Sequence, residues 1–312
     1  MGDLEQSGID SEALWRYIDE QIYSLPGTTA HRDAFTILLT GSRAIGVHTP
    51  ESDVDIDVLC PRSVYDSVHR ASLEAGIIKT DLSFFCVLGD DDWRRYFGRR
   101  TSRPHFALAP LEEVERQFRE YDDVWLWIWT KATVIADPGS QFRRIVESFA
   151  GYPKDILVRK IKYRWLLAAY WAIEVYPHHP TGPHGIPAAA TAILNSVNDL
   201  LRLFFLVEGK PFPYPEKLMP FAADTRLGRD FCPMLQHVVE LVVGAADAEL
   251  DAWSRLERAG QLLVCSDLSA DCRRLEEACA RAMIAAGVPE KWVEADFANI
   301  DELLLGRLGP VP

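Results

Sequence analysis

The chain lacks several features that would each point to a class of protein. Its 6 cysteines form no Cys-x-x-Cys pair, which argues against a structural zinc site and a disulfide framework. Its uncharged apolar runs, such as residues 124–129, are far shorter than the roughly 20 residues that span a membrane, so no transmembrane helix is expected. The first residues contain neither a basic nor an apolar leader segment, and a cytoplasmic location is expected.

The chain also lacks an excess of positive charge. The chain has 33 Lys and Arg against 46 Asp and Glu, which gives a formal net charge of −13. Nucleic-acid binding depends on Lys and Arg that neutralise phosphates, and this chain has no concentrated stripe of them. A nucleic-acid partner is therefore not expected.

The length and the pattern of elements predict two domains with an α+β fold overall. A chain of 312 residues suggests about two domains of roughly 100–200 residues each. The turn at Gly151-Tyr152-Pro153 places the boundary, giving domains 1–150 and 151–312. Apolar and β-branched patterns predict strands over 35–40, 53–59, 77–87 and 133–136 and helices over 11–24, 63–75, 111–121, 156–176, 187–208, 231–259, 268–286 and 301–308.

Acidic residues alternate on one predicted strand. Asp53 and Asp55 lie on either side of Val54, and Asp53 comes twelve residues after Gly41. Side chains two residues apart on a strand point to one face, so these carboxylates converge where a divalent cation could neutralise them. The Gly41-Ser42 pair at the end of the preceding strand offers backbone N–H groups that attract phosphate oxygens. The pattern predicts a site for Mg²⁺ and a nucleoside triphosphate; the alternative is an exposed edge strand with solvated carboxylates.

These residues match a known signature. Gly41-Ser42-Arg43-Ala44-Ile45-Gly46, followed by Ser52-Asp53-Val54-Asp55, resembles the motif of the polymerase-β-like nucleotidyltransferase superfamily. The resemblance covers about residues 34–138 and implies a mixed sheet with helices. The second half, notably residues 203–218, is similar to the α-helical C-terminal domains of antibiotic nucleotidyltransferases of the aminoglycoside and lincosamide type and of related minimal enzymes. A nucleotidyltransferase domain followed by a helical substrate-binding domain is therefore expected.

The resemblance implies roles for several carboxylates. Asp53 and Asp55 would bind Mg²⁺. The family places a third carboxylate on a neighbouring strand, and Asp81 is the candidate, either as general base or as a further metal ligand; a solvent-facing strand residue is the alternative. Asp57 lies on the same predicted face and is the first substitute for Asp81.

Basic and small residues are the candidates for nucleotide contacts. Gly41 and Ser42 would hold the triphosphate of an NTP, with ATP expected as co-substrate. Arg43 could add positive charge there or could face solvent. Lys217 is a candidate for a contact to the phosphates. The basic stretch at residues 94–103 is interpreted as a solvated face, with triphosphate or partner binding as the alternative.

A polar stripe interrupts an apolar helix in the second half. Asn195, Asn198, Asp199 and Arg202 recur at helical spacing and form one face. This face either meets solvent or lines a cleft and contacts the substrate. By contrast, His178, His179 and His184 are interpreted as a plain loop, and the tryptophans of residues 125–129 as core.

The function implied by the resemblance is Mg²⁺-dependent transfer of a nucleoside monophosphate, AMP being expected, from NTP to a hydroxyl of a small molecule. Pyrophosphate is released. An antibiotic or a biosynthetic intermediate would be the acceptor. Two alternatives remain open: nucleotidylation of a protein or tRNA in a toxin–antitoxin-like system, and a nucleotide-binding or interaction protein without catalysis.

Overall fold

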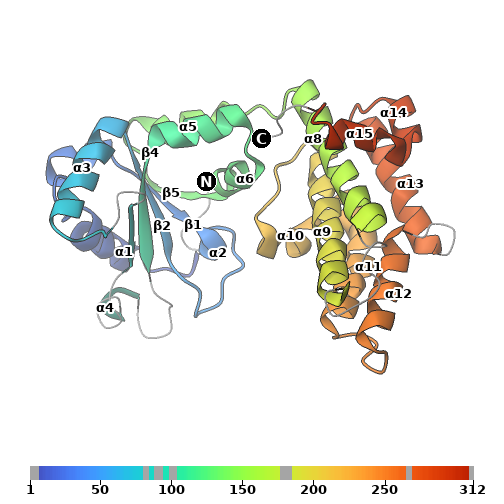
Figure 1. Ribbon diagram of the computed structural model, residues 1–312. Helices are drawn as coiled ribbons and strands as arrows, with labels where there is room; N and C mark the ends of the chain where they lie inside the picture. The colour runs from blue at the N-terminus through green and yellow to red at the C-terminus, as the bar shows by residue number, and fades with distance from the viewer. Residues whose placement is uncertain are drawn as a thin grey trace. The chain divides into compact units, whose positions relative to one another are not determined.

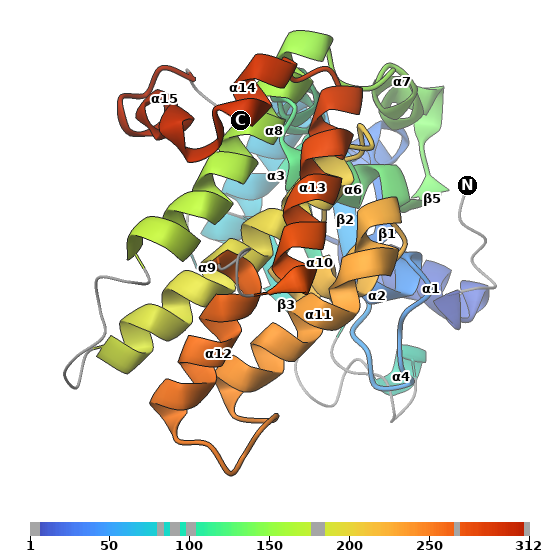
Figure 2. The same ribbon diagram turned by 90° about the vertical axis from the view of Figure 1, so that its right-hand side faces the viewer.

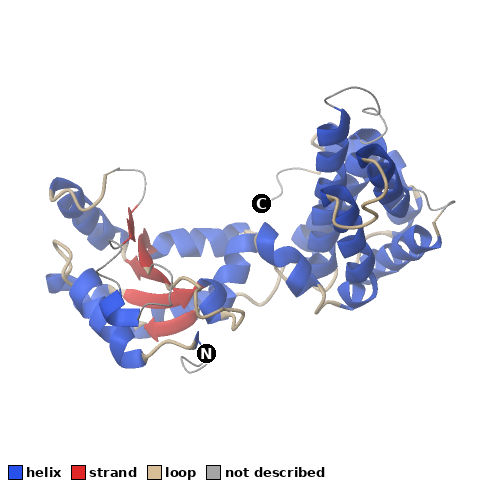
Figure 3. Ribbon diagram, turned by 90° about the horizontal axis from the view of Figure 1, so that it is seen from below, coloured by secondary structure: helices blue, strands red, loops and turns tan. Residues whose placement is uncertain are grey.

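The chain forms two compact units, Met1–Ala150 and Gly151–Pro312. The computed structural model describes residues 7–79, 84–87, 94–97, 104–175, 185–264 and 269–308. The first unit contains the sheet, and every described element of the second unit is helical (Figures 1 and 3). This is an α+β fold with a helical C-terminal half.

The sheet of the first unit has five strands in the order β3-β4-β2-β1-β5. β2 and β4 run parallel, whereas the other neighbouring pairs are antiparallel, so the sheet is mixed. The strands are β1 (Thr36–Thr40), β2 (Asp55–Cys60), β3 (Phe84–Val87), β4 (His105–Pro110) and β5 (Thr133–Ala136).

Seven helices are described in the first unit. They are α1 (Ser11–Tyr17, continued by a π-helical turn over Ile18–Ile22), α2 (Gly41–Ala44), α3 (Arg62–Glu74), α4 (Arg94–Phe97), α5 (Leu111–Glu120), α6 (Asp123–Lys131) and α7 (Gln141–Glu147), with 3-10 turns over Thr29–Ala34 and Pro138–Ser140. Asp137 accepts backbone N–H groups of Phe142 and Arg143. This carboxylate therefore satisfies the otherwise free donors at the start of α7.

The two faces of the sheet differ in character. Ile37, Ile56 and Val58 point to one face and pack in a buried core with residues of α1 and α3, among them Leu14 and Val68. Side chains alternate along a strand, so Asp55 and Asp57, together with Leu38, point to the opposite face. The two carboxylates thus lie on the face that is not packed against α1 and α3.

The second unit is a bundle around one long helix (Figure 2). Its helices are α8 (Lys154–Ala169, continued by a π-helical segment over Tyr170–Val175), α9 (Gly185–Leu206), α10 (Pro215–Ala222), α11 (Arg226–Val243), α12 (Ala252–Val264), α13 (Ala270–Ala285), α14 (Glu290–Glu294) and α15 (Ile300–Leu304), with a 3-10 turn over Asp296–Asn299. α9 contacts α8, α10, α11 and α12. The Ser196 hydroxyl donates to the carbonyl of Ala168 at 3.0 Å and ties α9 to α8.

α9 is the one described helix that is long and apolar enough to cross a membrane. Its most apolar stretch is 67% buried inside the unit. Phe204 and Leu206 are fully buried. This burial is that of a core helix, and it explains the apolar composition through packing with neighbouring helices.

Some predicted elements differ from the observed ones. β4 was not expected, because its sequence His-Phe-Ala-Leu-Ala-Pro has few β-branched residues and follows a basic run. A single helix over 231–259 is wrong: α11 ends at Val243, and the next residue, Gly244, adopts φ +76°, a left-handed conformation that terminates helices. The core interpretation of the tryptophans is confirmed for Trp127 and Trp129, which are buried, whereas Trp125 is 39% exposed and stacks on Trp129.

Candidate active site

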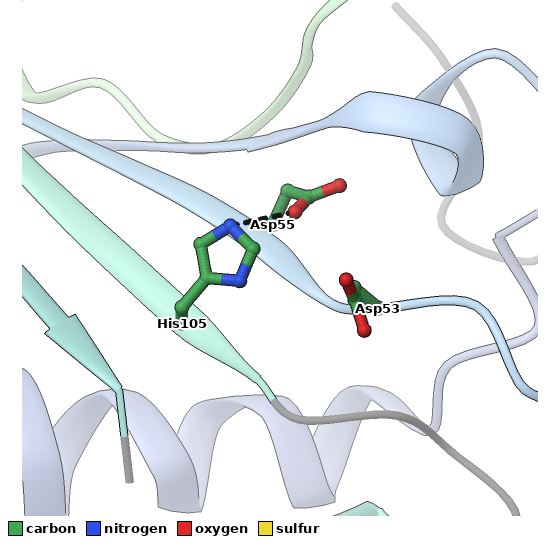
Figure 4. A group of neighbouring side chains, drawn as sticks. All are labelled: Asp53, Asp55 and His105. Atoms are coloured by element: carbon green, nitrogen blue, oxygen red, sulfur yellow. Dashed lines mark ion pairs between the residues drawn. The ribbon is translucent and has the colours of Figure 1, made fainter.

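Three potential ligand side chains meet at one end of the sheet (Figure 4). Asp55 begins β2 and pairs with Thr40 of β1 on one side and with His105 of β4 on the other. Asp53 comes from the loop before β2. The His105 Nε2 atom lies 2.7 Å from the Asp55 Oδ1 atom, and one ligand atom from each of the three side chains lies within 4.8 Å of the others.

Gly41 is packed directly against Asp55. A Cβ atom at position 41 would lie 1.8 Å from the Asp55 Oδ2 atom, far inside van der Waals contact. Gly41 also adopts φ +66°, which glycine accepts more readily than other residues. The position therefore requires glycine both for the backbone conformation and for the space that the carboxylate occupies.

Arg43 holds the loop that carries Asp53. Its buried guanidinium donates from Nε to the Asp53 carbonyl at 3.0 Å and from Nη2 to the Ser52 carbonyl at 2.9 Å. Nη1 donates to the Ser7 carbonyl at 3.0 Å. Burial lowers the pKa of Arg43, and the charges of Asp55 and Asp53 oppose that shift. These contacts of Arg43 hold the loop that carries Asp53 in place. The predicted contact of Arg43 with a nucleotide stays a prediction.

Asp57 lies deeper in the sheet than Asp55. Its Oδ2 atom accepts the hydroxyl of Thr40 at 2.7 Å. Burial raises the pKa of Asp57 to about 6; the hydrogen bond from Thr40 partly offsets this rise, and the nearby Asp55 adds to it. Asp57 therefore lies behind the candidate site and is bound to Thr40. The side chains of Asp55 and His105, by contrast, are about a quarter exposed to solvent.

The donor set fits a divalent cation. Carboxylate oxygens are the usual ligands of Mg²⁺, and an imidazole nitrogen beside them suits Mn²⁺ or Zn²⁺ as well. Asp53 is exposed, so the group is open on one side. Two carboxylates within this distance repel each other, and a bound cation would remove that repulsion.

His105 is the site residue that the sequence interpretation missed. It follows a basic stretch with no apolar pattern before it, and its strand was not predicted. The register of β4 with β2 brings it to Asp55, and no sequence signal specifies that register in advance. Asp81, the predicted third carboxylate, lies outside the described residues, as do His178, His179 and His184.

The polar stripe of α9 is only in part accessible. Asp199 is buried, and its Oδ1 atom accepts from Arg164 Nη1 of α8 at 2.9 Å and from Arg202 Nη1 at 3.1 Å. Both guanidinium groups also lie over the ring of Phe212, at 5.2 and 5.6 Å.

Asn195 and Asn198 of the same stripe are half-buried. The Lys217 amine lies 3.3 Å from a carboxylate oxygen of Glu216. The structure therefore brings Asp199 and Arg202 into one ion cluster, while the predicted substrate and nucleotide contacts of these residues stay predictions.

Comparison with known proteins gives limited matches. Residues 118–218 match the profile of a family described as a domain of unknown function (DUF4037). This range covers about a third of the chain and does not include the acidic site. No curated protein matches the chain.

Among solved structures, the chain resembles a nucleotidyltransferase-like protein from Exiguobacterium sibiricum. The TM-score is 0.41 and the sequence identity 12%, over 95% of this chain and 91% of that one.

Proposed function

We propose that the chain is a divalent-cation-dependent nucleotidyltransferase. The observation that carries the proposal is the approach of Asp53, Asp55 and His105 to within 4.8 Å, directly beside the Gly41 backbone. The spacing from Gly41-Ser42 to Asp53 and Asp55 supports it, because that motif joins a phosphate-binding turn to a pair of metal-binding carboxylates.

Each residue has a distinct task in this proposal. Asp53 and Asp55 hold the cation, with Mg²⁺ as the expected ion and His105 as a third donor. Gly41 and Ser42 hold the triphosphate of NTP, expected to be ATP. When bound, the cation supplies positive charge that neutralises the phosphate oxygens and the departing pyrophosphate.

The reaction exchanges one bond for another at the α-phosphorus of NTP. The acceptor hydroxyl loses its proton to a base, and its oxygen forms a bond to the α-phosphorus. The bond from that phosphorus to the bridging oxygen of the β-phosphate breaks, and pyrophosphate leaves with the electron pair. Asp81 is the base proposed from the sequence. Among the described side chains, His105 lies next to Asp55 of the proposed cation site.

A small hydroxylated molecule is the proposed acceptor, with an antibiotic or a biosynthetic intermediate as the leading classes. Asn195 and Asn198 of the α9 stripe are proposed to contact it, with Asp199 and Arg202 holding that stripe in place through their ion pair, and Lys217 is proposed to contact phosphates. The net charge of −13 favours a neutral or cationic acceptor over a nucleic acid. Resistance to an antibiotic and a cytoplasmic location belong to the same proposal.

The test is pyrophosphate release from ATP with Mg²⁺ and a panel of small hydroxylated acceptors, with the adduct identified by mass spectrometry. Asp53→Asn and Asp55→Asn should each reduce transfer by at least about a thousandfold, because they remove charge that holds the cation. The matched control is Asp66→Asn, an exposed carboxylate on α3, which should transfer at the wild-type rate. Near-normal transfer by folded Asp55→Asn would refute the metal assignment.

The same assay separates the alternatives. Label that appears on a protein or tRNA, and on no small acceptor, would favour macromolecular nucleotidylation. Cation-dependent ATP binding with no release of pyrophosphate under any condition would favour a nucleotide-binding protein without catalysis.

A further inference from the structure

Phe85 is an exposed aromatic side chain beside the acidic site. Half of its surface is exposed, whereas the preceding residue, Phe84, is buried. Its ring centroid lies 4.9 Å from that of His105. An apolar ring left in water next to a polar site is a surface on which a ligand can bury apolar area.

The strand register places Phe85 on the site face of the sheet. In the antiparallel pair of β3 and β4, Val87 is opposite His105 and Phe85 is opposite Ala107. Directly opposite residues share a face, and so do residues two apart. Phe85, His105 and Asp55 therefore point to the same side, and the opposite residue, Ala107, contributes only a methyl group beside the ring.

The order of the strands indicates from which side an acceptor reaches the site. β2, with Asp55, lies between β1, which ends at Thr40 directly before Gly41, and β4, which begins at His105. On the proposed function, on which this inference rests, Gly41 and Ser42 hold the pyrophosphate that leaves. Attacking and leaving oxygens lie roughly in line across the α-phosphorus. The attacking hydroxyl then approaches from the side of β4 and β3.

We propose that Phe85 forms the floor of the acceptor subsite and that the acceptor carries an aromatic ring close to the hydroxyl that receives the nucleoside monophosphate. The ring of the acceptor stacks on Phe85, which places its oxygen near His105 and Asp55. The hydroxyl proton passes to the base, the new oxygen–phosphorus bond forms, and pyrophosphate departs on the Gly41 side.

The experiment measures magnetisation transfer from the protein to a probe by saturation-transfer NMR, with Mg²⁺ and α,β-methylene-ATP present so that no transfer reaction occurs. The probe is 2-phenylethanol, and 2-cyclohexylethanol is its non-aromatic match. Wild-type protein should give a clear signal for 2-phenylethanol and a weaker one for the match. Phe85→Ala should reduce the aromatic signal at least about fivefold, and Phe85→Tyr should retain it, because stacking needs the ring.

Ile77→Ala is the control, since Ile77 is also exposed, at 40%, but lies outside the site strands; it should leave the signal unchanged. A signal that is equal in wild type and Phe85→Ala, or absent from both, overturns the subsite. If Phe85→Ala weakens binding of the nucleotide analogue in calorimetry and leaves the probe signal intact, Phe85 holds the base and the acceptor placement is wrong. Wild-type protein that does not bind the analogue with Mg²⁺ would instead refute the proposed function, and the subsite with it.

Discussion

The two units each gather charged side chains, and they do so in opposite ways. In the first unit, the carboxylates of Asp53 and Asp55 approach each other, and His105 is the basic side chain in that group. In the second unit, one buried carboxylate, Asp199, lies between the guanidinium groups of Arg164 and Arg202. The first arrangement brings like charges together, and the second pairs opposite ones.

This difference distinguishes the candidate site from an ion cluster that is paired within its own unit. An ion cluster that neutralises itself stabilises the fold and needs no ligand, although burial reduces its net contribution. Two carboxylates that converge cost free energy in the absence of a cation. The first cluster therefore combines two carboxylates with one imidazole, which lies 2.7 Å from Asp55, whereas Asp199 lies between two guanidinium groups of the helical unit.

Among the variants that test this comparison, the largest effect is expected from a methyl group at Gly41. Gly41→Ala should reduce transfer and cation affinity by at least about a hundredfold, since the new Cβ would lie 1.8 Å from Asp55 Oδ2 and would displace the carboxylate. The matched control is Gly46→Ala: Gly46 has φ +72° and nothing within 4 Å of an added Cβ, so it carries the backbone strain alone. Cation titrations followed by calorimetry should separate the two variants; equal losses would mean that strain, not the clash, matters.

The second prediction contrasts the two carboxylates by their effect on stability. Asp199→Asn should lower the free energy of unfolding by about 2 kcal/mol, because it leaves two partly buried guanidinium groups without a counter-charge. Asp55→Asn should leave the stability of the cation-free protein unchanged or raise it, because it relieves repulsion with Asp53. Urea unfolding of both variants measures this. A destabilised Asp55→Asn and an unchanged Asp199→Asn would reverse the comparison.

A third prediction concerns cation addition. A cation that binds only the folded state stabilises it by RT ln(1 + [L]/Kd), about 2.7 kcal/mol at a hundred times Kd. Thermal unfolding with and without MgCl₂ or MnCl₂ should therefore show a higher Tm for the wild type and for Asp199→Asn. Asp53→Asn should show no such rise, and a rise of wild-type size in that variant would place the cation elsewhere.

The smallest effect is expected on the helical face. Asn198→Ala should raise the Michaelis constant for the acceptor about three- to tenfold, and should leave that for NTP within twofold, if the α9 stripe contacts the acceptor. Gln261→Ala on α12, an exposed position, is the control and should change neither constant. Equal increases for both substrates would argue against separate recognition of the acceptor.

The sequence predicts those parts of the candidate site that depend on residue type and on spacing within a short segment. Asp53 and Asp55 could be found because alternation on a strand and the distance from Gly41 are local properties. The approach of His105 could not, because it depends on the register of a parallel pair separated by about fifty residues, and local sequence does not specify such a pairing. Arg43 was recognised as a charged residue of the motif, but the hydrogen bonds from its buried guanidinium to four backbone carbonyls are tertiary contacts that the motif does not reveal.

The Arg43 guanidinium also ties the beginning of the described chain to the centre of the site. One nitrogen of the side chain binds the Ser7 carbonyl, and others bind the loop of Asp53. Removing the segment through Ser7 would leave a buried cationic donor without that acceptor, which costs free energy, and the loop would lose part of its support. The backbone at Ser7 therefore helps to support the loop of the candidate site, although it is far from Asp53 in the sequence.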